Sequence, residues 1–183
     1  MMFTNVFTKT LRDDRRALIG WGTGVFLTIV LMAAVWPSFA DIDMTALLDQ
    51  YPDAMKDVFN IQDMSTGSGY LNAELYSLML PAIFIIFAVG RGARLIAGEE
   101  ELGTLEVLVS LPLPRRRILL EKAAALAVSV GVLALVLLVS IVLASAVIGM
   151  DIPVLDAFYG TVAMYLLGLE FGFLALALSA ATG

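Results

Sequence analysis

Long apolar runs with few or no charged residues alternate with polar stretches along this chain. A helix of about 20 apolar residues crosses the hydrocarbon layer of a bilayer. Four runs reach or approach that length, and they are residues 17–36, 75–97, 123–149 and 157–182. The second run meets a charge soonest, so we expect Arg91 and Arg94 to extend toward the lipid headgroups. The pattern predicts an all-α, polytopic membrane protein, a bundle of four spanning helices in one transmembrane domain over residues 1–183.

Two local features modify this picture of the spans. Pro81 removes a backbone donor inside the second run and is expected to bend that helix. A cleavable signal peptide is the alternative for the first run, since basic residues precede it and residues 38–40 resemble a cleavage site. The apolar part of a signal peptide has only about 7–15 residues. We therefore expect a retained signal anchor.

Composition supports the membrane assignment and removes several enzyme classes. Hydrophobic residues make up 60% of the chain and charged residues 15%, whereas soluble domains are about half apolar and a quarter charged. Cysteine and histidine are absent, which excludes disulfides, thiolate chemistry, His/Cys zinc sites and histidine general bases. The formal net charge of -6 argues against a nucleic-acid partner. The scattered methionines predict apolar filling and no metal site.

The distribution of charge predicts the orientation in the membrane. Basic residues gather in the N-terminal segment, residues 1–16, and in the connection between the second and third spans, residues 98–122. The positive-inside rule places both in the cytoplasm. The acidic stretch 37–74 then faces outward, and its periodic part, residues 44–61, predicts a short amphipathic helix. That helix is interpreted either as a cap over the span ends or as a substrate vestibule.

The connection at residues 98–122 has the most distinctive sequence. It begins with Glu99, Glu100 and Glu101, continues through an apolar segment broken by Pro112 and Pro114, and ends in a basic cluster. The apolar positions recur every three or four residues, so they can share one helical face; they are Leu102, Leu105, Leu108 and Val109. Amphipathicity alone allows an interfacial helix that merely joins two spans.

The string GEEELGTLEVLVSLP at residues 98–112, with the basic and apolar residues that follow it, resembles the first cytoplasmic loop of type-2 ABC transporter permeases. In that family the loop carries a coupling helix that docks on a separate ATPase. The resemblance implies a docking element formed by Gly103, Thr104, Leu105, Glu106 and Leu108 and flanked by Glu99, Glu100 and Glu101. It also implies that Arg115, Arg116, Arg117 and Lys122 hold the third span at the lipid surface. Residues 1–16 resemble the family's elbow helix.

The resemblance implies a permease subunit of an ATP-driven ABC exporter in a prokaryotic plasma membrane. Such a subunit works as a homo- or heterodimer with cytosolic ATPases, in contact with membrane lipid. This chain has no nucleotide-binding loop, so it is expected to have no catalytic residue and no cofactor; ATP and Mg belong to the partner ATPase. Family members usually have six spans, so we expect the chain to be incomplete at its C-terminus. The transported substrate stays open.

Two other classes of membrane protein share some of these features. A four-span carrier outside the ABC class, or a membrane assembly factor, stays open. An intramembrane protease built on Glu99 and Glu100 fails, because proteases of that type need histidine ligands or bases and the chain has no histidine.

Glu170 is the one charged residue of the fourth span. A charged side chain at the bilayer centre costs about 2.5–3.5 kcal/mol on insertion scales, so Glu170 is not expected to face lipid. A hydrogen bond to a hydroxyl such as that of Thr28 or Ser140 and a place in the translocation pathway both stay open. The motifs Gly20-x-x-x-Gly24 and Gly168-x-x-x-Gly172 permit close helix approach, within one chain or between two.

Overall fold

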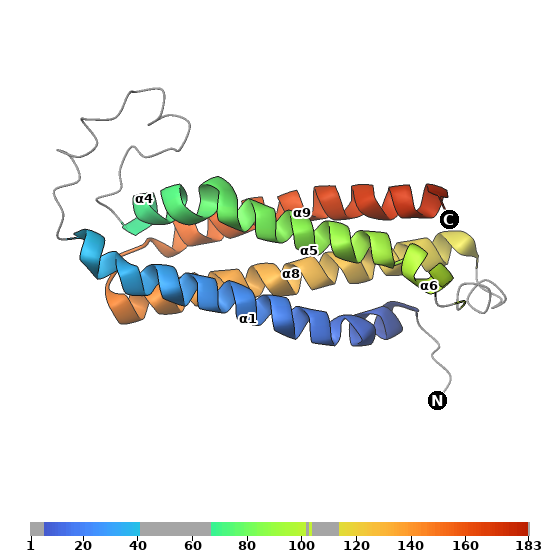
Figure 1. The fold of residues 1–183 in the computed structure, drawn as a ribbon, viewed down its shortest axis with the longest axis horizontal. Helices are drawn as coiled ribbons and strands as arrows, with labels where there is room; N and C mark the ends of the chain where they lie inside the picture. The colour runs from blue at the N-terminus through green and yellow to red at the C-terminus, as the bar shows by residue number, and fades with distance from the viewer. Residues whose placement is uncertain (1–5, 41–66, 102, 104–113, 183) are drawn as a thin grey trace, which may run out of the picture. The chain divides into compact units, whose positions relative to one another are not determined.

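The computed structural model describes residues 6–40, 67–101, 103 and 114–182, and every regular element in these residues is a helix. Four helical runs are long and apolar enough to cross a membrane. They are α1 (Val6–Ala40), the run Gly67–Arg94, α8 (Arg115–Ile148) and α9 (Val154–Thr182), shown in Figure 1. The predicted all-α architecture with four spans is confirmed. The amphipathic helix predicted at residues 44–61 lies outside the described residues.

Helix α1 is continuous across the boundary that the sequence suggested between an N-terminal segment and the first span. It begins at Val6, where the hydroxyl of Thr10 donates to the Val6 carbonyl oxygen at 2.9 Å. It ends at Ala40, three residues after Pro37. The described part of the elbow-like segment, residues 6–16, and the first span are therefore parts of one helix in this structure.

The second span is built from three helical pieces in succession. They are α4 (Gly67–Leu71), the π-helix η1 (Asn72–Met79) and α5 (Leu80–Arg94). The Leu80 N–H donates to the Leu75 carbonyl oxygen, five residues back, as a π-helix requires. Pro81 then lies in the first turn of α5, where a missing N–H is tolerated. The structure thus shows a change of helical winding beside Pro81, where the sequence predicted a bend.

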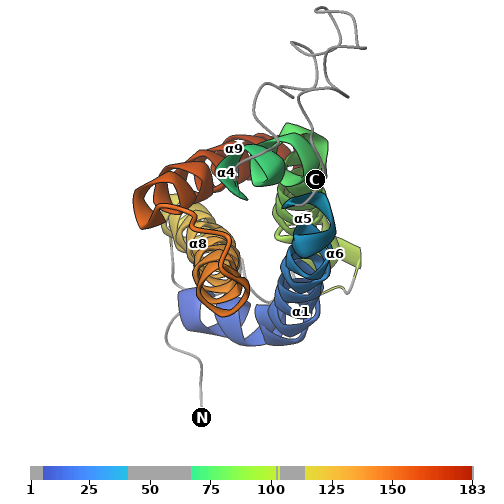
Figure 2. The ribbon, with the colours of Figure 1, turned by 90° about the vertical axis from the view of Figure 1, so that its left-hand side faces the viewer.

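A tight turn joins α8 to α9 (Figure 2). Gly149 follows the last residue of α8 with φ 73°, the left-handed conformation that commonly ends a helix. Asp151 also has a positive φ, 48°. Ser145 holds the turn, since its carbonyl oxygen accepts the Gly149 N–H at 2.9 Å and its hydroxyl accepts the Ile152 N–H at 3.1 Å.

The chain divides into two compact units, and each long helical run contributes to both. Unit 1 comprises residues 1–21, 83–133 and 165–183; unit 2 comprises residues 22–82 and 134–164. In unit 2, Trp36 packs on Tyr70 with ring centroids 5.3 Å apart, and the Tyr70 hydroxyl donates to the Met32 carbonyl oxygen at 3.3 Å. Aliphatic residues complete its core, among them Leu75, Leu137 and Ile141.

In unit 1, the glycines of α9 bring that helix close to α5 and α8. A Cβ at Gly168 would come within 2.8 Å of a Val130 methyl group, and one at Gly172 would meet Leu126 and Ala88. A Cβ at Gly92 of α5 would collide with the Gly172 carbonyl oxygen. The Gly168-x-x-x-Gly172 motif therefore serves packing within this chain. By contrast, a Cβ at Gly20 or Gly24 of α1 would have no atom within 4 Å.

Candidate functional site

The helix α6 (Ala97–Glu101) connects the end of α5 to the segment for which the sequence predicts a docking role. A turn at residues 95–96 separates α5 from α6, and the Ile96 carbonyl oxygen accepts the N–H groups of Glu99 and Glu100 at 3.0 and 3.1 Å. Gly103 follows with φ 65°, and its N–H donates to the Glu100 carbonyl oxygen at 2.9 Å. The backbone thus turns sharply before and after α6.

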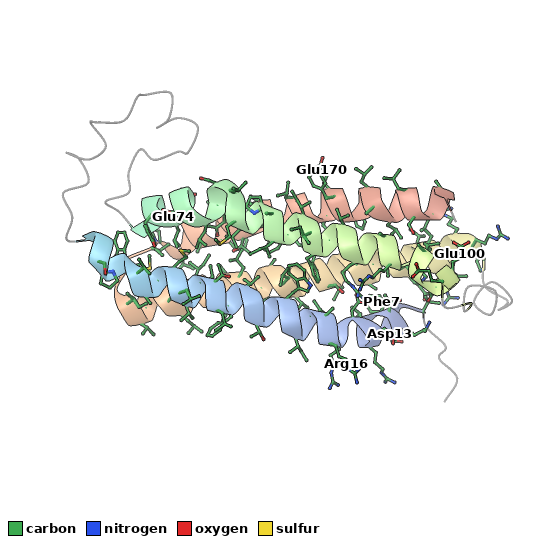
Figure 3. The ribbon with its side chains drawn as sticks, in the orientation of Figure 1. Phe7, Asp13, Arg16, Glu74, Glu100 and Glu170 are labelled. Atoms are coloured by element: carbon green, nitrogen blue, oxygen red, sulfur yellow. The ribbon has the colours of Figure 1, made fainter. Side chains whose placement is uncertain are left out.

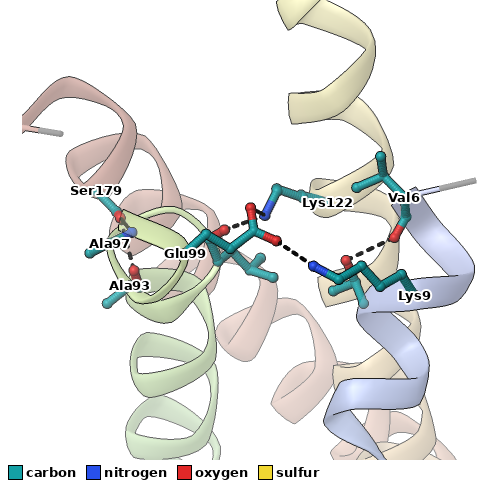
Figure 4. Close-up of polar contacts among 9 residues, drawn as sticks. Val6, Lys9, Ala93, Ala97, Glu99, Lys122 and Ser179 are labelled. Carbon is teal, nitrogen blue, oxygen red and sulfur yellow. Dashed lines mark hydrogen bonds and ion pairs between the residues drawn. The ribbon is translucent and has the colours of Figure 1, made fainter. Parts of the chain in front are cut away.

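Glu99 is the residue of α6 that turns inward. Its side chain is 14% exposed, and its carboxylate bonds two ammonium groups (Figure 4): Lys9 of α1 at 3.1 Å and Lys122 of α8 at 2.7 Å. Glu100 and Glu101 are exposed, and Figure 3 shows Glu100 on α6. One carboxylate therefore joins α6 to two long helices.

Lys122 lies inside the protein, with only 1% of its surface exposed. Its ammonium group also donates to the backbone carbonyl oxygen of Leu95, in the turn before α6. A buried charge is tolerated only when it is paired and hydrogen-bonded. In place of the headgroup contact predicted from the sequence, the structure gives Lys122 two acceptors within the protein.

Ser179 adds α9 to the same cluster. Its hydroxyl donates to the Ala93 carbonyl oxygen at 2.8 Å and accepts the Ala97 N–H at 3.1 Å. These two bonds hold the end of α5 and the start of α6 on one side chain, as Figure 4 shows. We call the group formed by Lys9, Leu95, Glu99, Lys122 and Ser179 the α6 clamp.

The electrostatics of the clamp keep Glu99 ionised. Burial acts to raise the pKa of the Glu99 carboxyl, but the hydrogen bonds and positive charges of Lys122 and Lys9 outweigh burial. The net effect holds the pKa of Glu99 below its usual value. The clamp therefore favours an ionised Glu99 carboxylate between the side chains of Lys9 and Lys122.

A second polar group in unit 1 links α1, α5 and α8. Asp14 is 1% exposed, accepts the Ser129 hydroxyl at 3.0 Å and forms an ion pair with Arg91. The expectation that Arg91 reaches the headgroups is therefore wrong, because its guanidinium pairs inside the bundle. Arg94, three residues later, is exposed.

Glu121 fixes the start of α1 against α8. Its carboxylate accepts the backbone N–H groups of Val6 at 2.9 Å and Phe7 at 3.3 Å, and it also bonds Arg117 at 2.8 Å. These N–H groups belong to the first turn of α1, where no helical carbonyl is available to accept them. The predicted basic residues Arg115, Arg116 and Arg117 are all exposed in the first turn of α8.

The structure brings together residues for which the sequence predicts separate roles. Glu99 is expected beside a docking element and Lys122 at the lipid surface, yet they form an ion pair. Sequence reasoning missed Asp14 and Ser179 as members of polar contacts. Asp14 carried a usable signal, since an acid at the edge of an apolar span needs a cation at the same depth. The predicted docking residues Thr104, Leu105, Glu106 and Leu108 lie outside the described residues.

Glu170 lies on an exposed face of α9 and points away from the neighbouring helices in Figure 3. It forms no hydrogen bond with any described residue, and Ser140 instead donates to the Val136 carbonyl oxygen of its own helix at 2.6 Å. Gly168 and Gly172, which bracket Glu170, face inward. Across the described ranges, no group of acidic side chains is arranged to hold a metal ion.

Comparison with known protein families gives a match that covers nearly the whole chain. The family described as ABC-2 family transporter protein matches residues 4–183. Searches of curated proteins and of solved structures found no match.

Proposed function

Because the chain belongs to the ABC-2 transporter family, we propose that it is the permease subunit of an ATP-driven exporter and couples to a separate cytosolic ATPase through residues 99–111. Family membership makes it a multi-pass membrane component of an ABC transporter. The proposal adds the direction of transport, the coupling segment and a pathway formed by two permease subunits. ATP and Mg belong to the partner, and this chain supplies no catalytic residue.

The α6 clamp is the observation that carries the proposal. Glu99 lies at the entrance to the proposed docking segment and is tied to α1 through Lys9 and to α8 through Lys122. Ser179 ties the same entrance to α9. A displacement of α6 by a docked partner would therefore pull on three long helices, and packed helices convert such displacements into rigid shifts. A helix that merely joined two spans would need no such ties.

The distribution of basic residues supports placing this end of the chain in the cytoplasm. Unit 1 contains the α6 clamp together with most of the exposed basic residues, which are Arg12, Arg15, Arg16, Arg94, Arg115, Arg116 and Arg117. Lysine and arginine near span ends favour the cytoplasmic side. The N-terminus and the docking segment then face a cytosolic ATPase, with Gly103, Thr104, Leu105, Glu106 and Leu108 as its contact.

Crosslinking tests the docking assignment directly, since the natural chain has no cysteine. A Leu105→Cys variant is treated with a short thiol-to-amine crosslinker in native membranes, and an Arg16→Cys variant at an exposed site of α1 is the control. We expect Leu105→Cys to capture a Walker-motif ATPase, identified by mass spectrometry, and Arg16→Cys to capture none. Failure to capture an ATPase from a complex that copurifies intact would show that the docking assignment is wrong.

We also propose that Glu170 lines the translocation pathway, which this chain would form together with the second permease subunit. Its exposed carboxyl at the middle of α9 has no partner among the described residues, and lipid is an unfavourable surrounding for it. Export is measured for Glu170→Gln at matched expression, with the similarly exposed Leu166→Ala as the control. Unchanged export by Glu170→Gln would remove the pathway role.

A further inference from the structure

An open groove of about 500 Å³ lies between the start of α1 and the start of α8 in unit 1. Its walls are mainly apolar and include Phe7, Pro114, Leu120 and Ala124. Arg116, Arg117 and Glu121 also line it, and because Arg117 is paired with Glu121, Arg116 supplies the uncompensated charge. The groove therefore combines an apolar wall with positive charge, the two surfaces of a phospholipid binding site.

The described residues balance only part of the positive charge beside the groove. The first turn of α8 contains three arginines and no acidic residue, although the N-terminal end of a helix already has a partial positive charge. Arg117 is paired with Glu121. In the described part of the chain, Arg115 and Arg116 have no acidic partner. The first turn of α8 is therefore suited to bind an anion.

The groove is held open by contacts beneath and beside it. Glu121 accepts the N–H groups of Val6 and Phe7, so its carboxylate is used by the start of α1 and by Arg117. Val6 and Ile118 form a small buried apolar cluster that joins the same two helices. The two walls are therefore fixed before any ligand binds, and a preformed site loses less entropy on binding.

We propose that this groove binds one anionic phospholipid. The phosphate lies at Arg116, which lines the groove, with the adjacent Arg115 of the same turn as a second donor, and guanidinium groups can bond phosphate oxygens in pairs. One acyl chain covers the apolar wall formed by Phe7, Leu120 and Ala124. A free phosphate would leave that wall in contact with water, so the apolar lining favours a lipid. This site goes beyond general attraction of a basic cluster to the membrane and does not depend on the proposed ATPase coupling.

Native mass spectrometry and thermal unfolding of the purified full chain test this site. The chain is placed in mixed micelles with phosphatidylglycerol or phosphatidylcholine of equal chain length. The test variant is Arg115→Gln/Arg116→Gln, and the control is Arg15→Gln/Arg16→Gln, which removes the same charge from exposed positions of α1. We expect one phosphatidylglycerol to be retained by the natural chain and the control, and its affinity to fall about tenfold or more in the test variant. Leu120→Gln, at an exposed position of the groove wall, should also weaken the binding of phosphatidylglycerol.

The outcomes distinguish a specific phospholipid site from nonspecific lipid binding and from a site for free phosphate. Both double variants should unfold at the natural temperature in phosphatidylcholine, which shows that they are folded. Equal retention of the two lipids, or equal loss in the test and control variants, would overturn the site. Displacement of the lipid by inorganic phosphate alone would overturn the acyl-chain contact. Retention of no lipid would mean that the chain itself fills the groove, and the proposal would fall.

Discussion

A lysine that is 1% exposed persists in this protein because its charge is matched at short range. The Lys122 ammonium bonds the Glu99 carboxylate and the Leu95 carbonyl oxygen, so two of its three N–H groups have acceptors. Removing one partner of a buried ion pair is costly, since the other charge stays buried without compensation. The same bonds that stabilise the α6 end therefore make Glu99 the residue most sensitive to substitution there.

We predict that Glu99→Gln lowers the stability of the α6 end while Glu100→Gln does not. The free energy of unfolding should fall by about 3 kcal/mol, which is at the lower end of the range for a broken buried ion pair because Glu99 is partly exposed. Thermal unfolding in detergent measures it, with Glu100→Gln as a neighbouring change of the same charge at an exposed position. The double variant Glu99→Gln/Lys122→Met should recover part of the loss, since it removes both charges. Equal destabilisation by the two single variants would contradict the clamp.

The stabilising effect of Glu99 should depend on pH in a defined direction. The folded protein holds the pKa of Glu99 below its usual value of 4.5, so the unfolded chain binds the proton more readily. The contribution is therefore complete above about pH 4.5 and is lost as the pH falls toward the lower, folded-state pKa. Unfolding midpoints of the natural chain and Glu99→Gln, measured from pH 7 downward, should converge in acid. A difference that stays constant over this range would show that the charge of Glu99 is unimportant.

The residues of the clamp could be predicted in part from the sequence, but their pairing could not. The sequence singles out Glu99 and Lys122, while their contact spans 23 positions and that of Glu99 with Lys9 spans 90. Local patterns predict which residues are charged and near a span end. Which charges meet depends on how separate helices pack, and no periodicity in the chain contains that information.

At the scale of the helices, α9 and α5 approach closely because glycines form their contact. A Cβ added at Gly92 would collide with a backbone carbonyl oxygen, which cannot move aside as a flexible side chain can. The sequence predicts close approach for the Gly168 motif and leaves its partner open. Gly92 was not among the predicted contacts, although Ala88-x-x-x-Gly92 has small-residue spacing. The sequence also predicts no π-helix before Pro81, because hydrophobic spacing specifies a helix without its winding.

We predict that Gly92→Ala destabilises the protein whereas Gly90→Ala does not. The first change should cost about 1–3 kcal/mol through overpacking. At Gly90 a Cβ meets no atom within 4 Å, so alanine should be neutral or add up to about 1 kcal/mol through its higher helix propensity. Each variant adds one methyl group, at positions about half a turn apart on the same helix, and thermal unfolding compares them. A similar midpoint for both would contradict the close contact of α5 with α9.

At the scale of the whole molecule, the number of spans was predictable because it depends on local stretches of apolar residues. A run of about 20 apolar residues satisfies its backbone within its own helix and buries its side chains in lipid, whatever its neighbours are. The four helical runs of the structure coincide with the four apolar runs of the sequence. Their ends differ, as in α1, because polar turns at either end can stay helical outside the hydrocarbon layer.

The side of the membrane on which α6 lies is the property of the whole molecule on which the proposed coupling depends. We predict that Asp151→Cys, in the exposed α8–α9 turn, reacts with a membrane-impermeant maleimide on intact cells, and that Glu101→Cys reacts only after permeabilisation. Both positions are exposed and the natural chain has no cysteine, so the two sites report topology without background. One span, α8, separates Glu101 from Asp151, so the two positions should lie on opposite sides of the membrane. Labelling of Glu101→Cys on intact cells would place α6 outside the cell, beyond the reach of a cytosolic ATPase. Coupling through residues 99–111 would then be wrong, although the four spans would be unaffected.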